Sequence, residues 1–403
     1  MSDKAHTPVI VSGVRTPVGR FLGGLATLTA PQLGAIAVRE AVSRSGVDPS
    51  ALDEVIVGHV VQAGAGQAPA RQAAIQAGIP GTVPAVTINK VCGSGLKAVM
   101  LAAQAIRAGD LQVAVAGGME SMSNVPYYLR GLRSGVKFGD QRQEDGLILD
   151  GLWCSFGQCH MGGHAEYTAQ KAGVTRAEAD AFSLRSHQKA VAAMEAGKFD
   201  GEIVPVTVPG RKGDTVVDRD ESPRPDTSLE ALGRLRPAFP KDAPQDIEEL
   251  VVTAGNAPGL NDGAAALVVC SQAFAEAHGL EIRAVITGYA SGGTEPRDLF
   301  FAPIAAVNNL MERTGDSIGD YDVIEVNEAF AVQAIADMRA LGMDEDRVNV
   351  HGGAVALGHP IGASGARILV TLLSALEDRD QERGLATLCL GGGNAVALSV
   401  QRG

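Results

Sequence analysis

The sequence predicts an α/β protein made of two similar halves, with an inserted region between them. Short apolar runs typical of buried strands alternate with alanine- and leucine-rich helical patterns, and this alternation indicates α/β layering. A second set of similar elements follows residue 280, as an internal duplication predicts. Between the two sets, from about residue 121 to 250, the periodicity weakens and polar residues and proline become more frequent.

The first half reads as strands and helices in turn. Its predicted strands are Val9 to Val11, Glu54 to Val57, Thr87 to Asn89 and Val113 to Ala116. A helix is predicted from Gly95 to Ala108, because apolar residues recur there close to helical spacing. These apolar residues cover more than one side of the helix, so we expect the helix to be buried.

The second half repeats several segments of the first. Ala284 to Gly288 resembles Val9 to Gly13, Tyr321 to Val326 resembles Asp53 to Val57, and Leu385 to Gly391 resembles Val113 to Gly117. The clearest repeat pairs Cys92-Gly-Ser-Gly-Leu-Lys-Ala-Val with Gly362-Ala-Ser-Gly-Ala-Arg-Ile-Leu, which aligns Ser94 with Ser364 at an offset of 270. Two copies of one α/β unit can form a single pseudo-symmetric body. We assign residues 1–120 and about 251–275 to the first half, 121–250 to the insertion, and 276–403 to the second half.

The insertion has a weaker pattern than either half. It contains one predicted amphipathic helix, Arg176 to Ala196, and a polar stretch from Gly210 to Lys241. From Arg211 to Lys241 there are seven Lys and Arg residues against six Asp and Glu residues, so the stretch is barely positive. A solvated surface and a phosphate-binding site are equally compatible with this charge pattern.

Composition excludes several classes of protein. The formal net charge of −12 argues against nucleic-acid binding, which normally needs a basic face. No apolar run is long enough to span a bilayer, so we expect no membrane insertion. The chain starts with neither a signal-peptide pattern nor the arginine-rich pattern of a transit peptide. The five cysteines are odd in number and scattered, which suits a reducing compartment and a cytoplasmic protein.

Cys92 is the first candidate for catalysis, because it stands where a predicted strand ends and a helix begins. Unpaired backbone N–H groups and the positive end of the helix dipole both favour a thiolate at such a position. The alternative is a structural cysteine buried beside a tight turn.

Three segments of the second half carry further candidates. Asn327 follows a buried apolar strand, where a polar side chain is well placed for a site, although asparagine is also a common helix cap. His359 lies between a glycine and a proline, in a loop that fixes its imidazole as a general base or oxyanion donor requires. Cys389 precedes the glycine run that begins at Gly391, whose backbone N–H groups can face a developing oxyanion.

Together these segments resemble the thiolases, and the resemblance covers essentially the whole chain in order. Its motifs are Asn89-Lys-Val-Cys-Gly-Ser-Gly, Asn327-Glu-Ala-Phe, Gly358-His-Pro-Ile-Gly-Ala-Ser-Gly and Cys389-Leu-Gly-Gly-Gly. The resemblance implies a five-layered αβαβα body from two duplicated mixed-sheet α/β halves, with an inserted loop domain. It also implies acetyl-CoA C-acetyltransferase activity, the reversible Claisen condensation of two acetyl-CoA to acetoacetyl-CoA and CoA. Coenzyme A thioesters would be substrates, and no cofactor is expected.

The resemblance also implies a role for each catalytic candidate. Cys92 would attack a thioester carbonyl and hold the acyl group, while His359 takes the thiol proton. Cys389 would remove the α-proton of a second acetyl-CoA, a step that decarboxylating ketoacyl synthases do not need. One oxyanion hole would combine His359 Nε2 with a water held by Asn327, and the other the backbone N–H groups of Cys92 and Gly391.

The same resemblance implies substrate contacts from the insertion. Cys159-His160-Met161-Gly162 is similar to a segment of the acetoacetyl-CoA type, in which His160 touches the substrate and Met161 narrows the acyl pocket. Arg236 would lie near the nucleotide and Phe239 beside the pantetheine, and Phe330 would line the pocket. A homotetramer is the common assembly of the family, with contacts expected from the insertion between Val125 and Leu149.

The chain departs from the family pattern at several positions. Pro258 stands where many relatives have serine, Pro240 to Glu249 lengthens a segment beside the coenzyme, and His351 replaces an asparagine. The segment Phe300 to Pro303 is also unusual near the acyl pocket. These departures leave open a 3-ketoacyl-CoA thiolase that accepts longer chains.

Two further alternatives fit the sequence less well. A noncatalytic acyl-CoA-binding homologue would be expected to lack a catalytic group, whereas this chain keeps all four. A nucleotide-binding oxidoreductase is excluded, because too little sequence follows Gly391 to Gly393 for a βαβ unit.

Overall fold

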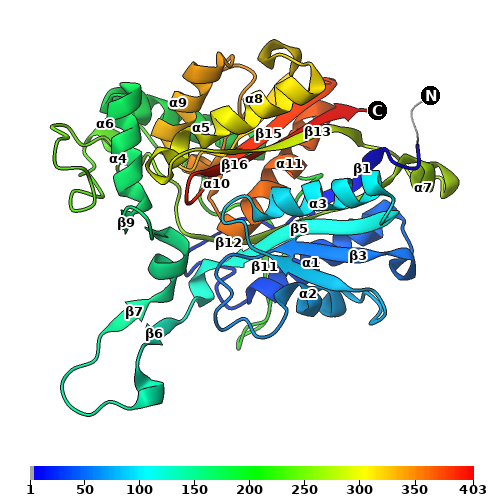
Figure 1. The fold of residues 1–403 in the computed structure, drawn as a ribbon, viewed down its shortest axis with the longest axis horizontal. Helices are drawn as coiled ribbons and strands as arrows, with labels where there is room; N and C mark the ends of the chain where they lie inside the picture. The colour runs from blue at the N-terminus through cyan, green and yellow to red at the C-terminus, as the bar shows by residue number, and fades with distance from the viewer. Residues whose placement is uncertain (1–3) are drawn as a thin grey trace.

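The computed structural model describes residues 4–403, so the first three residues of the predicted first half lie outside the described part. Within this range a mixed sheet of ten strands runs through the molecule (Figure 1). Its strands are β1 (Pro8–Arg15), β2 (Gly19–Arg20), β3 (Glu54–Gly58), β4 (Ala85–Ile88), β5 (Val113–Ser121), β12 (Asn261–Ser271), β13 (Ala284–Gly293), β14 (Val323–Val326), β15 (Arg383–Leu390) and β16 (Asn394–Arg402). The strand order is β14-β15-β16-β13-β1-β12-β5-β3-β4, and β2 pairs with β12.

The sheet has the internal symmetry that the repeated segments predict. In one half the order is β1-β12-β5-β3, and in the other it is β13-β16-β15-β14. In both halves the first three strands are antiparallel neighbours and the fourth runs parallel to the third. The halves join through β1 and β13, where Val9 pairs with Val285 and Ile10 with Ala284. Each repeated strand segment therefore occupies the equivalent place in its half.

Helices separate and cover the two halves of the sheet. They are α1 (Ala30–Ser45), α2 (Pro69–Ala77), α3 (Ser94–Ala108), α7 (Gln272–Ala277), α8 (Ala302–Thr314), α9 (Ala331–Leu341), α10 (Ala354–Leu357) and α11 (Ile361–Asp378). Figure 1 shows α1 and α2 on one outer side, α3 and α11 between the halves, and α8 on the other outer side. This order of layers is the αβαβα arrangement expected from the sequence.

The two central helices meet at a pair of repeated glycines. A Cβ atom on Gly95 of α3 would lie 2.6 Å from the backbone nitrogen of Ala366, and one on Gly365 of α11 would lie 2.5 Å from that of Leu96. Neither distance is open to a real Cβ atom, so both positions need glycine for the helices to approach this closely. The two glycines follow Ser94 and Ser364, the residues that the duplication aligned.

The insertion forms small elements around one end of this body. They are β6 (Tyr127–Leu129), β7 (Gln143–Asp145), β8 (Trp153–Cys154), β9 (Cys159–His160), α4 (Met161–Ala172), α5 (Arg176–Glu195), β10 (Val206–Val208), β11 (Thr215–Val217) and α6 (Leu229–Gly233). The predicted helix at Arg176 is confirmed as α5, which begins with a capping box between Thr175 and Glu178. In Figure 1 the β6–β7 hairpin extends away from the body as an arm.

Parts of the insertion and of the strand pattern differ from expectation. Asp220, in the polar stretch, is buried and pairs with Arg15 at 2.7 Å, so this stretch is not all solvated surface. The predicted strand Thr87 to Asn89 is wrong at its end, because the Asn89 side chain accepts the N–H of Val91 at 2.9 Å and starts a turn instead. No helix among the residues described is long and apolar enough to cross a bilayer.

We predict that Gly365→Ala destabilises the protein, although alanine favours a helix by about 1 kcal/mol over glycine. The added methyl group forces α11 away from α3, and overpacking of this kind costs about 1–3 kcal/mol. Thermal and urea denaturation measure the change. Gly201→Ala is the matched control, because a Cβ atom there meets nothing within 4 Å. Equal melting temperatures for the two variants would contradict the close contact.

Candidate active site

A cavity of about 310 Å³ is lined by residues of both halves and of the insertion. Eight of the sequence-predicted site residues line it: Cys92, His160, Met161, Phe239, Phe330, His359, Cys389 and Gly391. Asn327 is buried with its amide nitrogen 3.5 Å from His359 Nδ1. Arg236 is exposed and does not line this cavity.

Cys92 stands in a tight turn between β4 and α3. The Asn89 carboxamide and the Ser94 hydroxyl hold this turn, since Ser94 Oγ accepts the N–H of Lys90 at 2.8 Å and donates to the carbonyl of Val91 at 2.6 Å. Val91 has φ of +48°, a conformation that a β-branched residue rarely adopts. The strained turn presents the Cys92 side chain to the cavity.

The thiol of Cys92 is neutral in the resting protein. Its pKa is raised to about 12, mainly by burial and, as the smallest cause, by the carboxylate of Glu120. The backbone N–H groups of Cys92 and Gly391 both donate to the sulfur and act in the opposite direction, but more weakly than burial. The donors at the helix start lower the pKa as the sequence suggests, but the loss of solvation outweighs them.

His359 lies two residues before the start of α11, and neighbouring groups fix both its backbone and its ring. The Asn261 side chain accepts the backbone N–H of His359 at 2.8 Å. Gly358 has φ of +108°, and a Cβ atom on it would lie 2.6 Å from the Asn261 side chain, so the chain can pass this close only as glycine. On the ring itself, Nδ1 lies 2.6 Å from Ser364 Oγ.

These contacts assign the protons of the imidazole. Ser364 Oγ donates to the carbonyl of Pro360 at 3.0 Å, so it accepts a hydrogen bond from His359 Nδ1 at 2.6 Å. This contact outweighs the one with the Asn327 amide nitrogen, which would need a lone pair on Nδ1 but lies farther away, at 3.5 Å. The proton of the neutral ring is then on Nδ1, and the lone pair is on Nε2, which is buried without a hydrogen-bond partner at the cavity. Burial, and secondarily the charge of Arg367, lower the pKa of His359 to about 3. The ring is therefore neutral and can accept a proton at Nε2.

Cys389 is the penultimate residue of β15 and lies on the wall of the same cavity. Burial raises the pKa of its thiol well above the ordinary range, and nearby Cys92 and Asp337 raise it further. Cys389 is thus also a thiol at rest. The turn after it contains Gly392 and Gly393 with φ of +82° and +85°, a tight geometry that leaves the Gly391 N–H directed at Cys92.

An aromatic wall faces these groups. His160 stacks on Phe239 with ring centroids 4.6 Å apart, Phe239 meets Phe330 edge-on at 6.4 Å, and Phe330 meets Phe300 at 5.3 Å. His160 also caps α4, because its ring Nδ1 accepts the backbone N–H of Gly162. The backbone N–H of His160 donates to the Asp242 carboxylate at 2.9 Å. Two of the departures noted in the sequence, Pro258 and Phe300, line the cavity, which is largely apolar on this side.

Sequence reasoning missed two residues that position the site. Asn261 fixes the His359 backbone, and buried Glu120 accepts the N–H groups of Val60, Val61 and Gly362. The signals available in the sequence were two polar pairs, Glu120-Ser121 at the end of β5 and Asn261-Asp262 at the start of β12. The groups that they contact lie far away in the sequence.

Comparison with known proteins agrees with this geometry. The family model for the thiolase N-terminal domain matches residues 8–273, and that for the thiolase C-terminal domain matches residues 280–402. The chain is 53% identical to an acetyl-CoA acetyltransferase of Pseudomonas aeruginosa over 98% of this chain and 99% of the relative. It is 51% identical to one of Escherichia coli K12, over 98% of each. The crystal structure of the Bacillus anthracis acetyl-CoA acetyltransferase superposes with a TM-score of 0.95 at 42% identity, over 100% of both chains. The chain belongs to the thiolase family.

Proposed function

We propose that this thiolase is an acetyl-CoA C-acetyltransferase, which converts two acetyl-CoA into acetoacetyl-CoA and CoA and catalyses the reverse reaction. The observation that carries the proposal is the shared cavity, where two neutral thiols and a neutral imidazole with a free Nε2 meet. The relatives at about half identity bear this name, which favours it over a thiolase for longer 3-ketoacyl chains.

In the first half-reaction, the Cys92 thiol gives its proton to His359 Nε2 as the sulfur attacks the thioester carbonyl. The bond from the carbonyl carbon to the CoA sulfur then breaks, and Cys389 supplies the proton that CoA carries away. Acetyl-Cys92, a Cys389 thiolate and a protonated His359 remain. The neutral resting thiols suit this order of steps, because each thiol loses its proton only when a base or a leaving group is present to accept it.

In the second half-reaction, the Cys389 thiolate removes an α-proton from a second acetyl-CoA. The enolate oxygen is stabilised by His359 Nε2–H and by a water held by Asn327. The enolate carbon attacks acetyl-Cys92, and the backbone N–H groups of Cys92 and Gly391 receive the new oxyanion. Cys92 then leaves as a thiolate and recovers its proton from His359, which restores the resting state.

The wall residues hold the substrate in this scheme. His160 and Phe239 are stacked where the pantetheine arm enters, and Met161 and Phe330 limit the space for the acyl group. Arg236, exposed outside the cavity, is proposed to meet the nucleotide of CoA.

We also propose a homotetramer in the cytoplasm. The β6–β7 arm carries exposed apolar side chains, including Leu129, Leu132 and a fully exposed Phe138, which a partner subunit would cover. All five cysteines are free, a state that a reducing compartment maintains. Measuring the mass of the assembly in solution tests the homotetramer directly.

Variants of the two thiols separate the half-reactions. Cys92→Ala should retain no acyl group from radiolabelled acetyl-CoA, because the attacking sulfur is gone. Cys389→Ala should still be acylated at Cys92, but its exchange of acetyl-CoA α-protons with deuterated water should fall by at least about 10²-fold, since the base is missing. Cys270→Ala removes a buried cysteine outside the site and should keep both reactions. Label on the Cys92 variant, or undiminished exchange with the Cys389 variant, would refute the assigned roles.

The acylation rate should depend little on pH between 8 and 5. His359 has a pKa lowered from 6.5 to about 3, so Nε2 stays free to accept a proton throughout this range. A base with the ordinary pKa would lose about 30-fold in its neutral form by pH 5. Rapid-quench acylation with acetyl-CoA measures the profile, and an acid limb centred near pH 6.5 would contradict a buried, neutral base.

Short acyl chains should be preferred. We expect kcat/KM for thiolysis of acetoacetyl-CoA to exceed that of 3-ketooctanoyl-CoA by at least about tenfold, because Met161 and Phe330 fill the space that a longer chain needs. Met161→Ala should narrow this ratio, whereas Met194→Ala, on the distant helix α5, should not. If the unmodified enzyme prefers the longer substrate, the chain is instead a 3-ketoacyl-CoA thiolase.

A further inference from the structure

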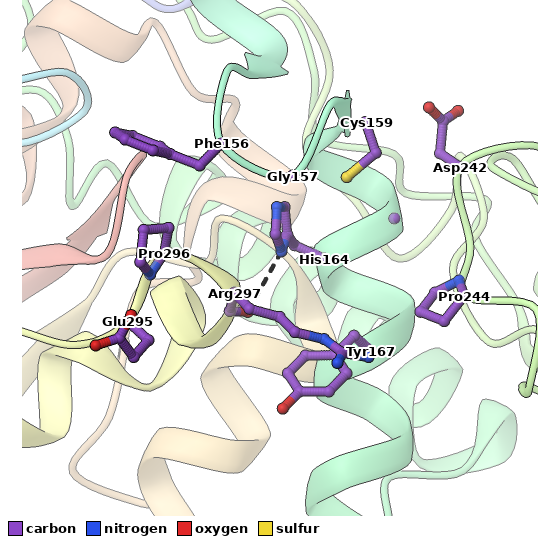
Figure 2. Close-up of a pocket in the computed structure, with 11 residues that line it drawn as sticks. Phe156, Gly157, Cys159, His164, Tyr167, Asp242, Pro244, Glu295, Pro296 and Arg297 are labelled. Atoms are coloured by element: carbon purple, nitrogen blue, oxygen red, sulfur yellow. Dashed lines mark hydrogen bonds between the residues drawn. The ribbon is translucent and has the colours of Figure 1, made fainter.

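A second pocket, of about 460 Å³, lies beside the β8–β9 hairpin and the start of α4 (Figure 2). None of the residues that line it lines the active-site cavity. Its wall includes Gly157 and Cys159 from the hairpin and His164 from α4, together with Asp242 and Arg297. The pocket therefore gathers a thiol, an imidazole and charged groups that the proposed reaction does not use.

His164 has one ring nitrogen engaged and the other free. Nδ1 lies 3.3 Å from the carbonyl oxygen of Arg297, which can only accept, so the ring proton is on Nδ1. The Nε2 lone pair then has no hydrogen-bond partner, although the residue is only 4% exposed. Burial lowers the pKa of His164, which keeps the ring neutral and its Nε2 able to take a proton.

The free nitrogen and the Cys159 thiol face the same space. A Cβ atom placed on Gly157 would lie 2.8 Å from His164 Nε2 and 3.3 Å from Cys159 Sγ. Figure 2 shows the sulfur of Cys159 directed toward the His164 ring across this point. Burial, and after it Cys154 and Asp242, raise the pKa of Cys159, so this thiol needs a base in order to react. His164 Nε2 makes no hydrogen bond in the described part of the structure and is the free acceptor on the same space.

A third group stands across the hairpin. Cys154 of β8 is the register partner of Cys159 in β9. Residues directly opposite in antiparallel strands have Cα atoms about 4.5–5.5 Å apart, inside the range of about 4.4–6.8 Å that a disulfide spans. Cys154 is 2% exposed and its sulfur accepts the N–H of Gly157 at 3.2 Å, so it is shielded from solvent yet adjacent to Cys159.

We propose that Cys159 is a reactive thiol outside the active site, which a hydroperoxide oxidises with His164 as the base and which Cys154 then resolves into a disulfide. In the first step the Cys159 sulfur attacks one oxygen of hydrogen peroxide. The O–O bond breaks, and Cys159 sulfenic acid and water form, with the thiol proton passing through His164 Nε2 to the leaving hydroxide. In the second step the Cys154 sulfur displaces that hydroxyl group, which leaves as a second water. Each thiol loses one electron overall, and the peroxide gains two.

A metal at this position is the competing interpretation, since thiolate and imidazole are common ligands. Within residues 4–403, no group of three or more His, Cys, Asp and Glu side chains is arranged to hold a metal ion. The cross-strand register favours a sulfur–sulfur bond instead.

Peptide mass spectrometry tests the proposal on the full-length enzyme. Cleavage after Lys and Arg places Cys154 and Cys159 together in the peptide Gln143 to Lys171, and each of the other three cysteines in a different peptide. After brief treatment with hydrogen peroxide and alkylation, we expect the first peptide to lack both alkyl groups and to weigh two hydrogens less than its dithiol form. A reducing thiol should restore alkylation at both cysteines.

Variants identify the role of each residue. Cys154→Ser should stop at the sulfenic acid, which dimedone labels at Cys159. His164→Asn should slow oxidation by about 10²-fold or more, because the base is removed, whereas His278→Asn, at an exposed histidine stacked on Phe274, should not change the rate.

Three results would overturn the proposal. The first is a peptide that stays fully alkylatable after peroxide treatment, or one that is oxidised no faster than buried Cys270, which is 0% exposed. The second is an unchanged rate in His164→Asn. The third is a Cys154→Ser enzyme that gives no dimedone adduct at Cys159, a readout that does not depend on how well His164→Asn folds. None of these outcomes bears on acylation at Cys92, so the proposed function is tested separately.

Discussion

The contact between α3 and α11 is the constraint on which the site depends. Gly95 and Gly365 allow the two helices to approach until each backbone meets the other. Cys92 precedes the first helix, and His359 precedes the second. Because the duplication places the same small residue at the same turn of both helices, their starts reach one cavity from opposite halves. A larger distance between α3 and α11 would separate the Cys92 sulfur from His359 Nε2, the nitrogen that takes its proton.

Burial then decides the charge state of every group in the site. It keeps Cys92 and Cys389 as thiols and His359 as a neutral base, so the resting cavity holds no separated charges. The N–H groups of Cys92 and Gly391 are too weak to ionise a buried thiol, but they are already oriented for an oxyanion that forms during reaction. Donors fixed in this way stabilise charge without a cost of reorganisation. The site is therefore organised for charges that exist only transiently.

Much of the fold, including the α/β layers and the duplication, could be predicted from the sequence, because local residue patterns indicate it. The apolar runs, the helical pattern from Arg176 and each copy of the repeated segment at Ser94 and Ser364 are contained within short stretches of sequence. The strand predicted through Asn89 was wrong because the asparagine side chain captured a backbone N–H and began the nucleophile turn. The family resemblance supplied the site residues, but not their charge. The protonation of Cys92 depends on how much chain covers it, and the Asn261 contact to His359 joins positions far apart. Sequence patterns carry neither quantity.

The two cysteine–histidine pairs show why an activated thiol does not by itself define a reaction. In each pair, Nδ1 is bound by a neighbouring oxygen and Nε2 is left with a free lone pair. Around Cys92, the Gly391 N–H donor can receive a carbonyl oxyanion, which suits acyl transfer. Around Cys159, burial raises the pKa of the thiol most, and the neighbouring Cys154 and Asp242 raise it further, so a lasting negative charge is opposed there and the thiol proton needs a base. A carbonyl addition intermediate would be repelled at the second site, whereas the step that forms a disulfide leaves both sulfurs neutral. The group beside each cysteine–histidine pair therefore selects the reaction. It is the Gly391 N–H beside Cys92 and the Cys154 thiol beside Cys159.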